Sequence, residues 1–151
     1  MRVSVNEQEG RTDITVEVLS PPGSRWAREL AGLIRNLDGC VYGYASPGSP
    51  ERTAVRLADV QLFEVSSRNA VIVLADGREL ESPMRLFQLE EALAGTEFVR
   101  VSRQVIVNFD YVRKIRPEVG ARLVLELESG RLEIVTRAYA PAIRKKLGME
   151  R

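Results

Sequence analysis

Three short polar segments interrupt apolar, strand-like stretches of this sequence, and each carries side chains suited to reading nucleic-acid bases. They are residues 66–69, 102–104 and 136–137. Arginine can donate two parallel hydrogen bonds to guanine in the major groove, and asparagine or glutamine can pair likewise with adenine, each contact contributing about 1–3 kcal/mol of discrimination. We therefore take Asn69, Arg103 and Arg137 as candidate base-contacting residues. The alternative for each is an ordinary surface loop or salt bridge.

Other polar and basic residues near these segments, and on the last predicted helix, suit phosphate oxygens, which set the register of a complex without reading its sequence. The candidates for supporting or phosphate contacts are Arg68, Ser102, Gln104, Thr136, Arg144, Lys145 and Lys146. A basic helix end is also favourable against the helix dipole with no ligand present. Tyr139 is expected to pack rather than to read bases.

The composition argues against catalysis and against metal binding through histidine or cysteine clusters. The chain has no histidine and a single cysteine, Cys40. Histidine is the side chain best suited to proton transfer near neutral pH, so catalytic triads and Cys-His pairs are excluded. Paired carboxylates such as Glu90 and Glu91 are interpreted as solvated charge. We expect no enzymatic activity, no cofactor and no metal site.

Positive charge is concentrated in the last third of the chain. Residues 98–151 hold 12 of the 22 basic residues but only 6 of the 21 acidic ones, whereas residues 61–97 hold 3 basic and 7 acidic residues. A protein of net charge +1 can therefore present a basic face to phosphates.

The elements that position the polar segments are predicted to be mainly strands. Alternating or continuous apolar runs predict strands at 55–57, 60–65, 71–74, 78–81, 98–101, 105–107, 112–115, 123–127 and 132–134. One helix is expected to begin at Pro83 with Ser82 as its cap, to bury Leu86, Leu89 and Leu93, and to end at Gly95. Its exposed face is acidic, so it should cover the sheet rather than contact DNA, and helix-turn-helix recognition is not expected.

The first fifty residues predict a small α+β extension. Alternating apolar residues indicate two short strands within residues 3–19, and Ser24 can cap a helix beginning at Arg25. Trp26, Leu30, Leu33 and Leu37 form a stripe expected to pack on those strands. Residues 41–44 are a further candidate strand, and the Pro, Gly and Ser residues of 46–50 indicate a linker. Without an apolar run of about 20 residues or a signal-peptide core, a cytoplasmic location is expected.

Several motifs in a fixed order resemble the LytTR family of bacterial DNA-binding domains. They are Phe-Val-Arg-Val-Ser-Arg-Gln-Val-Ile-Val-Asn at 98–108, Ile-Val-Thr-Arg-Ala-Tyr at 134–139 and Ile-Arg-Lys-Lys-Leu-Gly at 143–148. The resemblance spans residues 52–148. It implies several small antiparallel sheets, loops inserted into the DNA major groove, and binding to paired repeats as dimers or tandem protomers. Many members have Lys-Ser or His-Lys-Ser in place of Ser102-Arg103-Gln104, and Ser-Arg in place of Thr136-Arg137, so the preferred bases can differ.

These observations predict a sequence-specific DNA-binding transcriptional regulator of mainly β fold with short helices. Residues 1–50 would form the extension, a candidate dimerisation or regulatory element, and residues 51–151 the LytTR-type domain. The expected partners are double-stranded DNA, a second copy in a homodimer and, by the resemblance, a membrane protein encoded nearby. The alternative is a β-rich protein-interaction module whose basic third contacts an acidic protein, without DNA readout.

Overall fold

The computed structural model describes residues 1–12 and 14–149, except for the side chains of residues 32, 33 and 35–38 in the first helix. Its elements are α1 (Arg25–Asp38), β1 (Cys40–Gly43), β2 (Thr53–Arg56), η1 (Leu57–Asp59), β3 (Val60–Ser66), β4 (Asn69–Leu74), β5 (Glu79–Glu81), α2 (Leu86–Ala92), β6 (Phe98–Arg100), β7 (Val105–Asn108), η2 (Phe109–Tyr111), β8 (Val112–Glu118), β9 (Arg122–Leu127), β10 (Leu132–Val135) and α3 (Ala140–Lys146). The strands form antiparallel sheets in the orders β1-β2, β5-β4-β3-β7-β6 and β10-β9-β8. The expected mainly β fold with short helices is confirmed.

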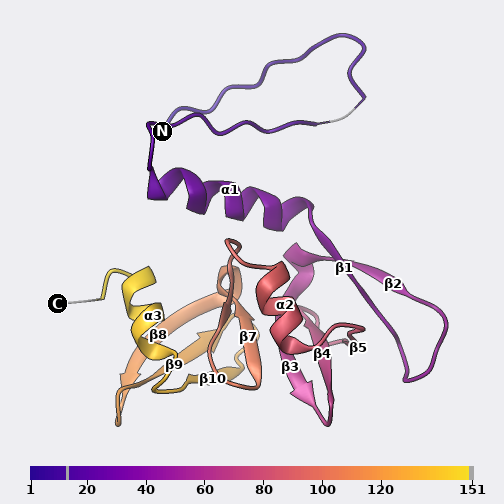
Figure 1. The fold of residues 1–151 in the computed structure, drawn as a ribbon, viewed down its shortest axis with the longest axis vertical. Helices are drawn as coiled ribbons and strands as arrows, with labels where there is room; N and C mark the ends of the chain where they lie inside the picture. Colours follow the sequence, from indigo (N-terminus) through magenta and orange to yellow (C-terminus); the bar gives the residue numbers. More distant parts are fainter. Residues whose placement is uncertain (13, 150–151) are drawn as a thin grey trace.

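The long helix α1 lies across one side of the sheets, and the N-terminal residues extend beyond it (Figure 1). The three-stranded sheet and α3 lie at one end of the molecule, and the β1-β2 hairpin projects from the other. The β3-β4 turn lies on the side away from α1, at the lower edge of the view.

The central strand β3 is buried on both faces, because its side chains alternate between two cores. Phe63 packs in a cluster with Ile72, Phe98 and the buried leucines of α2. Leu62 packs on the opposite face, in a cluster formed by β9, β10 and α3. Each such side chain contributes about 1.5–3 kcal/mol when fully buried. The five-stranded sheet is thus held between α2 and the three-stranded sheet, which makes it a firm support for its loops.

Helix α2 begins later than the sequence predicted. The predicted start at Pro83 is wrong, because the Ser82 backbone N–H still donates to the Ala70 carbonyl at 2.8 Å and continues the sheet. The Ser82 hydroxyl instead accepts from the Met84 N–H at 3.0 Å in a turn, and the helix begins at Leu86. The buried leucine stripe and the role of α2 as a cover over the sheet are confirmed.

The two strands predicted within residues 3–19 are absent from the described part of this segment. Val3, Val5, Ile14 and Val16 are 57–94% exposed. Alternation makes a stable strand only where a neighbouring edge pairs with it and buries one face. The pattern of residues 3–19 has no such neighbour among the described residues.

Helix α1 begins at Arg25 as predicted, and the Ser24 hydroxyl accepts from the Ala27 N–H at 3.2 Å. The prediction that α1 packs on N-terminal strands is wrong, since Trp26 is 55% exposed and no strand is present among residues 1–12 and 14–23. The side chains of Leu33 and Leu37 lie outside the described residues. The far end of α1 joins the sheets through η1, where the Leu57 N–H donates to the Gly39 carbonyl at 2.9 Å.

Residues 46–50 connect two paired strands. β1 pairs with β2 from Cys40↔Arg56 to Gly43↔Thr53, and Tyr44 exchanges two backbone hydrogen bonds of 2.8 Å with Glu81 at the edge of the five-stranded sheet. The segment interpreted as a linker is therefore the loop of a hairpin. A Cβ atom on Gly43 would lie 2.8 Å from the Leu80 Cβ, so the hairpin packs closely on β5.

Candidate nucleic-acid interface

The three polar segments meet at one end of the five-stranded sheet. The first is the β3-β4 turn, the second joins β6 to β7, and the third joins β10 to α3. The Val65 N–H donates to the Gln104 carbonyl at 2.9 Å, which links the first segment to the second. The Thr136 N–H donates to the Val101 carbonyl at 3.0 Å, which links the second to the third. Backbone hydrogen bonds thus fix the spacing of the three loops independently of their side chains.

The β3-β4 turn is tight. Ser66 pairs with Asn69, and Ser67 adopts a positive φ of 61° between them. Arg68 is exposed at the tip. Asn69 is the first paired residue of β4, and its Nδ2 donates to the Glu81 Oε1 at 2.5 Å. The amide of Asn69 is therefore directed toward β5 and away from the second loop.

The second loop is compact and presents its long side chains outward. The Ser102 hydroxyl accepts from the Gln104 N–H at 3.2 Å. Arg103 and Gln104 are exposed. Arg103 has no side-chain hydrogen bond or ion pair to another described residue. The sequence prediction missed Arg100, at the end of β6, whose guanidinium donates to carbonyls of this loop. Its position two residues before the polar segment was the available signal.

The third loop leads directly into α3. The Thr136 carbonyl accepts from the N–H groups of Tyr139 and Ala140, both at 3.0 Å. Arg137 is exposed, and its side chain likewise has no hydrogen bond or ion pair within the described ranges. Tyr139 is partly buried against the core formed by β9, β10 and α3, which confirms the packing role expected for it.

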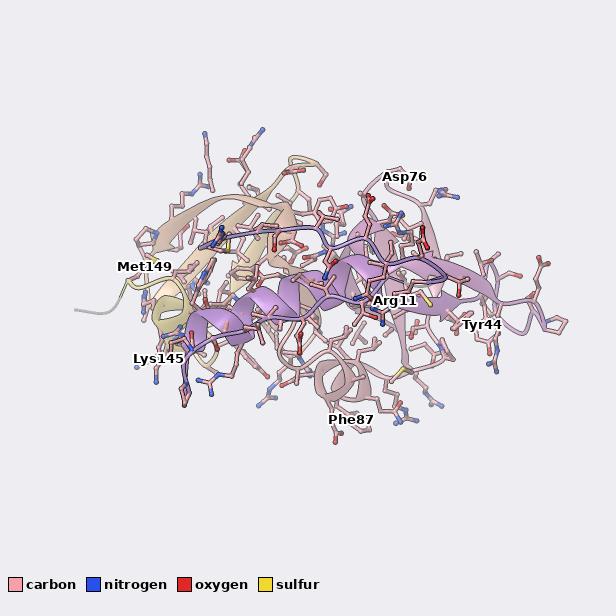
Figure 2. The ribbon with its side chains drawn as sticks, turned by 90° about the horizontal axis from the view of Figure 1, so that it is seen from above. Arg11, Tyr44, Asp76, Phe87, Lys145 and Met149 are labelled. Atoms are coloured by element: carbon pink, nitrogen blue, oxygen red, sulfur yellow. The ribbon has the colours of Figure 1, made fainter. Side chains whose placement is uncertain are left out.

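Lys146, a cation in the last turn of α3, has its contacts away from the second loop. Lys146 Nζ is 3.6 Å from the Glu97 Oε1 and 5.8 Å from the centre of the Phe109 ring. Glu97 and Phe109 flank the β6-β7 pair at the end opposite the second loop, where Phe98 pairs with Asn108. Lys145 is exposed at one end of the molecule, far from Tyr44 (Figure 2). The structure therefore places Lys146 away from the base-reading candidates.

Glu64 and Glu90, two acidic side chains near the loops, pair with arginines. Glu64, near the end of β3, accepts a hydrogen bond from Arg131, which also binds Glu133 at 2.6 Å. Burial alone lowers the pKa of Arg131, but its hydrogen bonds to these carboxylates and their negative charge outweigh burial and raise the pKa above its ordinary value. Glu90 of α2 is bound to Arg100 at 2.6 Å. These arginines offset negative charge that a phosphate would otherwise meet at Glu64 and Glu90.

The chain is similar to known proteins in sequence and in fold. The sequence profile of the LytTr DNA-binding domain matches residues 51–148. HTH-type transcriptional regulators from Staphylococcus aureus strains N315 and MRSA252 are 22% and 21% identical over 151 residues, covering 99% of this chain and 99% of each relative. The fold is similar to the LytTr DNA-binding domain assigned to a methyl-accepting/DNA response regulator from Bacillus cereus, with a TM-score of 0.65 and 22% identity. That match covers 74% of this chain and 98% of the other.

The names of the staphylococcal relatives refer to a helix-turn-helix, but the helices described for this chain are not arranged in that way. Strands lie between α1 and α2 and between α2 and α3, so within residues 1–12 and 14–149 no two helices follow one another across a short turn. None of the described helices is long and apolar enough to cross a membrane.

Proposed function

Since the chain belongs to the LytTR family of DNA-binding domains and is a transcriptional regulator, we propose that it reads its operator by inserting three loops into the major groove. The observation that carries this proposal is the convergence of the three loops at one end of the sheet, joined by backbone hydrogen bonds of 2.9 and 3.0 Å. Two exposed arginines project from them without partners among the described residues. Membership of a DNA-binding family also confirms the expectation that the chain is not an enzyme.

The side chains of the three loops would have different roles, base contact or phosphate contact, according to their chemistry. Arg103 and Arg137 have their full set of donors available for guanine, and Asn69 would pair with adenine. Arg68, Ser102, Gln104 and Thr136 border these positions and would contact phosphates or support the readers. Arg144 and Lys145 would bind phosphates beside the opposite end of the β6-β7 pair. Lys146 would do so only on leaving Glu97.

Replacing either exposed arginine should reduce discrimination between DNA sequences. We expect Arg103→Ala and Arg137→Ala each to cost about 1–3 kcal/mol on a specific duplex and little on a scrambled one, because each removes a bidentate base contact. Fluorescence anisotropy at two salt concentrations, on duplexes from the upstream region of the protein's own gene, measures both affinities. Arg78→Ala is the matched control, since Arg78 is exposed and pairs with Asp76 in a distant turn.

The same experiment tests the alternative of a protein-interaction module. Binding to DNA releases counterions, so the affinity of a DNA-binding protein falls steeply as salt rises. Equal binding to every duplex, with both arginine variants behaving as the unsubstituted protein, would contradict base reading by these loops and favour the interaction module.

We also propose that the protein acts in the cytoplasm as a homodimer on paired repeats. This proposal rests on the binding mode that is usual in the LytTR family. Sedimentation of the protein with a duplex carrying two half-sites should give two copies per duplex, and one copy at every concentration would contradict this. A membrane protein encoded nearby is the proposed regulator. Unchanged DNA affinity and target expression after deletion of such a neighbour would argue against that role.

A further inference from the structure

Arg100 is the long polar side chain beside the reading loops that faces inward. Its side chain is 15% exposed, whereas Arg103 is exposed to solvent. Arg100 Nε donates to the Ser102 carbonyl at 2.8 Å, and Nη2 donates to the Arg103 carbonyl at 2.6 Å. Nη1 binds the Glu90 Oε2 of α2 at 2.6 Å. All three guanidinium nitrogens are therefore engaged within the protein.

This geometry fixes the direction in which the second loop presents its side chains. Two successive carbonyls of the loop face the same planar guanidinium, so the backbone is anchored at the residue that carries the Arg103 side chain. A planar fork of donors can hold two carbonyls and a carboxylate together, whereas the ammonium of lysine is a single point of charge.

We propose that Arg100 is a positioning residue for base reading: it orders the loop of Arg103, with Glu90 holding its guanidinium from α2. This inference rests on the proposed function of that loop. Arg100 itself would contact neither bases nor phosphates, because each of its three guanidinium nitrogens already donates within the protein and its side chain is largely covered.

The experiment compares Arg100→Gln, Arg100→Lys and Glu90→Gln, with Arg78→Gln as the control for loss of an arginine from an ion pair. Backbone order parameters of residues 102–104 in the free protein should fall from about 0.85 to below about 0.6 in Arg100→Gln. The affinity ratio between a specific and a scrambled duplex should fall about tenfold, while affinity for the scrambled duplex stays within about twofold. Arg100→Lys and Glu90→Gln should lose less, and Arg78→Gln should match the unsubstituted protein.

A purely structural role would give a different pattern. If Arg100→Gln only unfolds part of the protein, specific and scrambled affinities fall by one common factor, Arg100→Lys restores no discrimination, and the proposal is overturned. Unchanged order parameters and an unchanged ratio in Arg100→Gln overturn it as well. If Arg100→Gln does not fold, Glu90→Gln decides by the same two measurements. If the unsubstituted protein does not discriminate between duplexes, the proposed function fails, whereas the order parameters alone still decide whether Arg100 orders the loop.

Discussion

Asn69 is the candidate base contact whose side chain already has a partner in the free protein. The Glu81 carboxylate can only accept hydrogen bonds, so it must receive the Asn69 N–H, and this fixes which way the amide faces. One N–H and the carbonyl oxygen of the amide remain for a base. Glu81 would thus set the orientation of the Asn69 amide that contacts a base. The sequence did not single out Glu81 for this role.

A change at Glu81 should therefore alter readout without removing Asn69. Glu81→Gln supplies a side chain that can either donate or accept, so the Asn69 amide can take both orientations. We expect the specific-to-scrambled affinity ratio to fall by about fivefold, within the range of one weakened base contact. Anisotropy on duplexes varied at each position should show the loss at one base pair. A uniform gain in affinity across all duplexes would instead mean that only the carboxylate's charge matters.

At the scale of single residues, the sequence predicted which side-chain types lie on exposed loops, but not their partners. Arg103 and Arg137 were expected on exposed loops, and they lie there. The partners of Asn69 and Lys146 were not foreseeable, because Glu81 and Glu97 come from other elements that only the folded sheet brings close. Arg100 was missed for the same reason, since its role depends on backbone carbonyls whose direction no sequence pattern encodes.

The predicted strands form wherever a neighbouring strand pairs with them. Every strand expected between residues 54 and 135 forms, because each has a neighbour and a core face. The same alternation at residues 3–19 lacked a partner and gave no strand in the described segment. The start of α2 was misplaced because Ser82 and Pro83 are good helix-starting residues, yet pairing of the sheet continues through Ser82.

The hairpin β1-β2 offers a test of packing at the scale of an element. Gly43→Ala places a Cβ 2.8 Å from the Leu80 Cβ and 3.3 Å from the Glu81 carbonyl oxygen, so backbone or core must shift. Overpacking of this kind costs about 1–3 kcal/mol of unfolding free energy, which chemical denaturation measures. Thr53→Ala, at the exposed position paired with Gly43, is the control and should change it by less than about 0.5 kcal/mol. Equal effects in both variants would mean that the hairpin does not pack on β5.

At the scale of the whole molecule, the boundary predicted after residue 50 falls within a paired unit. The family profile begins at residue 51, but β1 pairs with β2 and Tyr44 pairs with Glu81. The fold match covers 74% of the chain, more than the roughly two thirds that follow residue 50. Composition indicated a linker at 46–50 but could not reveal that the chain folds back across it and pairs β1 with β2.

Two truncations should separate these parts. A chain of residues 24–151 keeps the Ser24 cap and should retain its unfolding free energy to within about 1 kcal/mol, because Val18 is the only half-buried residue described in 1–23. A chain of residues 51–151 loses β1, α1 and the bond from Leu57 to Gly39, and should lose more than about 2 kcal/mol. Thermal and chemical denaturation of both chains checks this. Equal stability would place the whole extension outside the folded unit.

The backbone bonds that join the three loops also bear on how this regulator could diverge. Because Val65, Gln104, Val101 and Thr136 are linked through main-chain atoms, the scaffold does not depend on which side chains occupy the loop tips. A substitution at the tip of one loop leaves the positions of the other two loops unchanged. Each substitution can therefore change the preference at one base pair while the other contacts stay the same. Duplicated copies of such a gene could acquire separate operators by successive single steps, without passing through an unfolded intermediate.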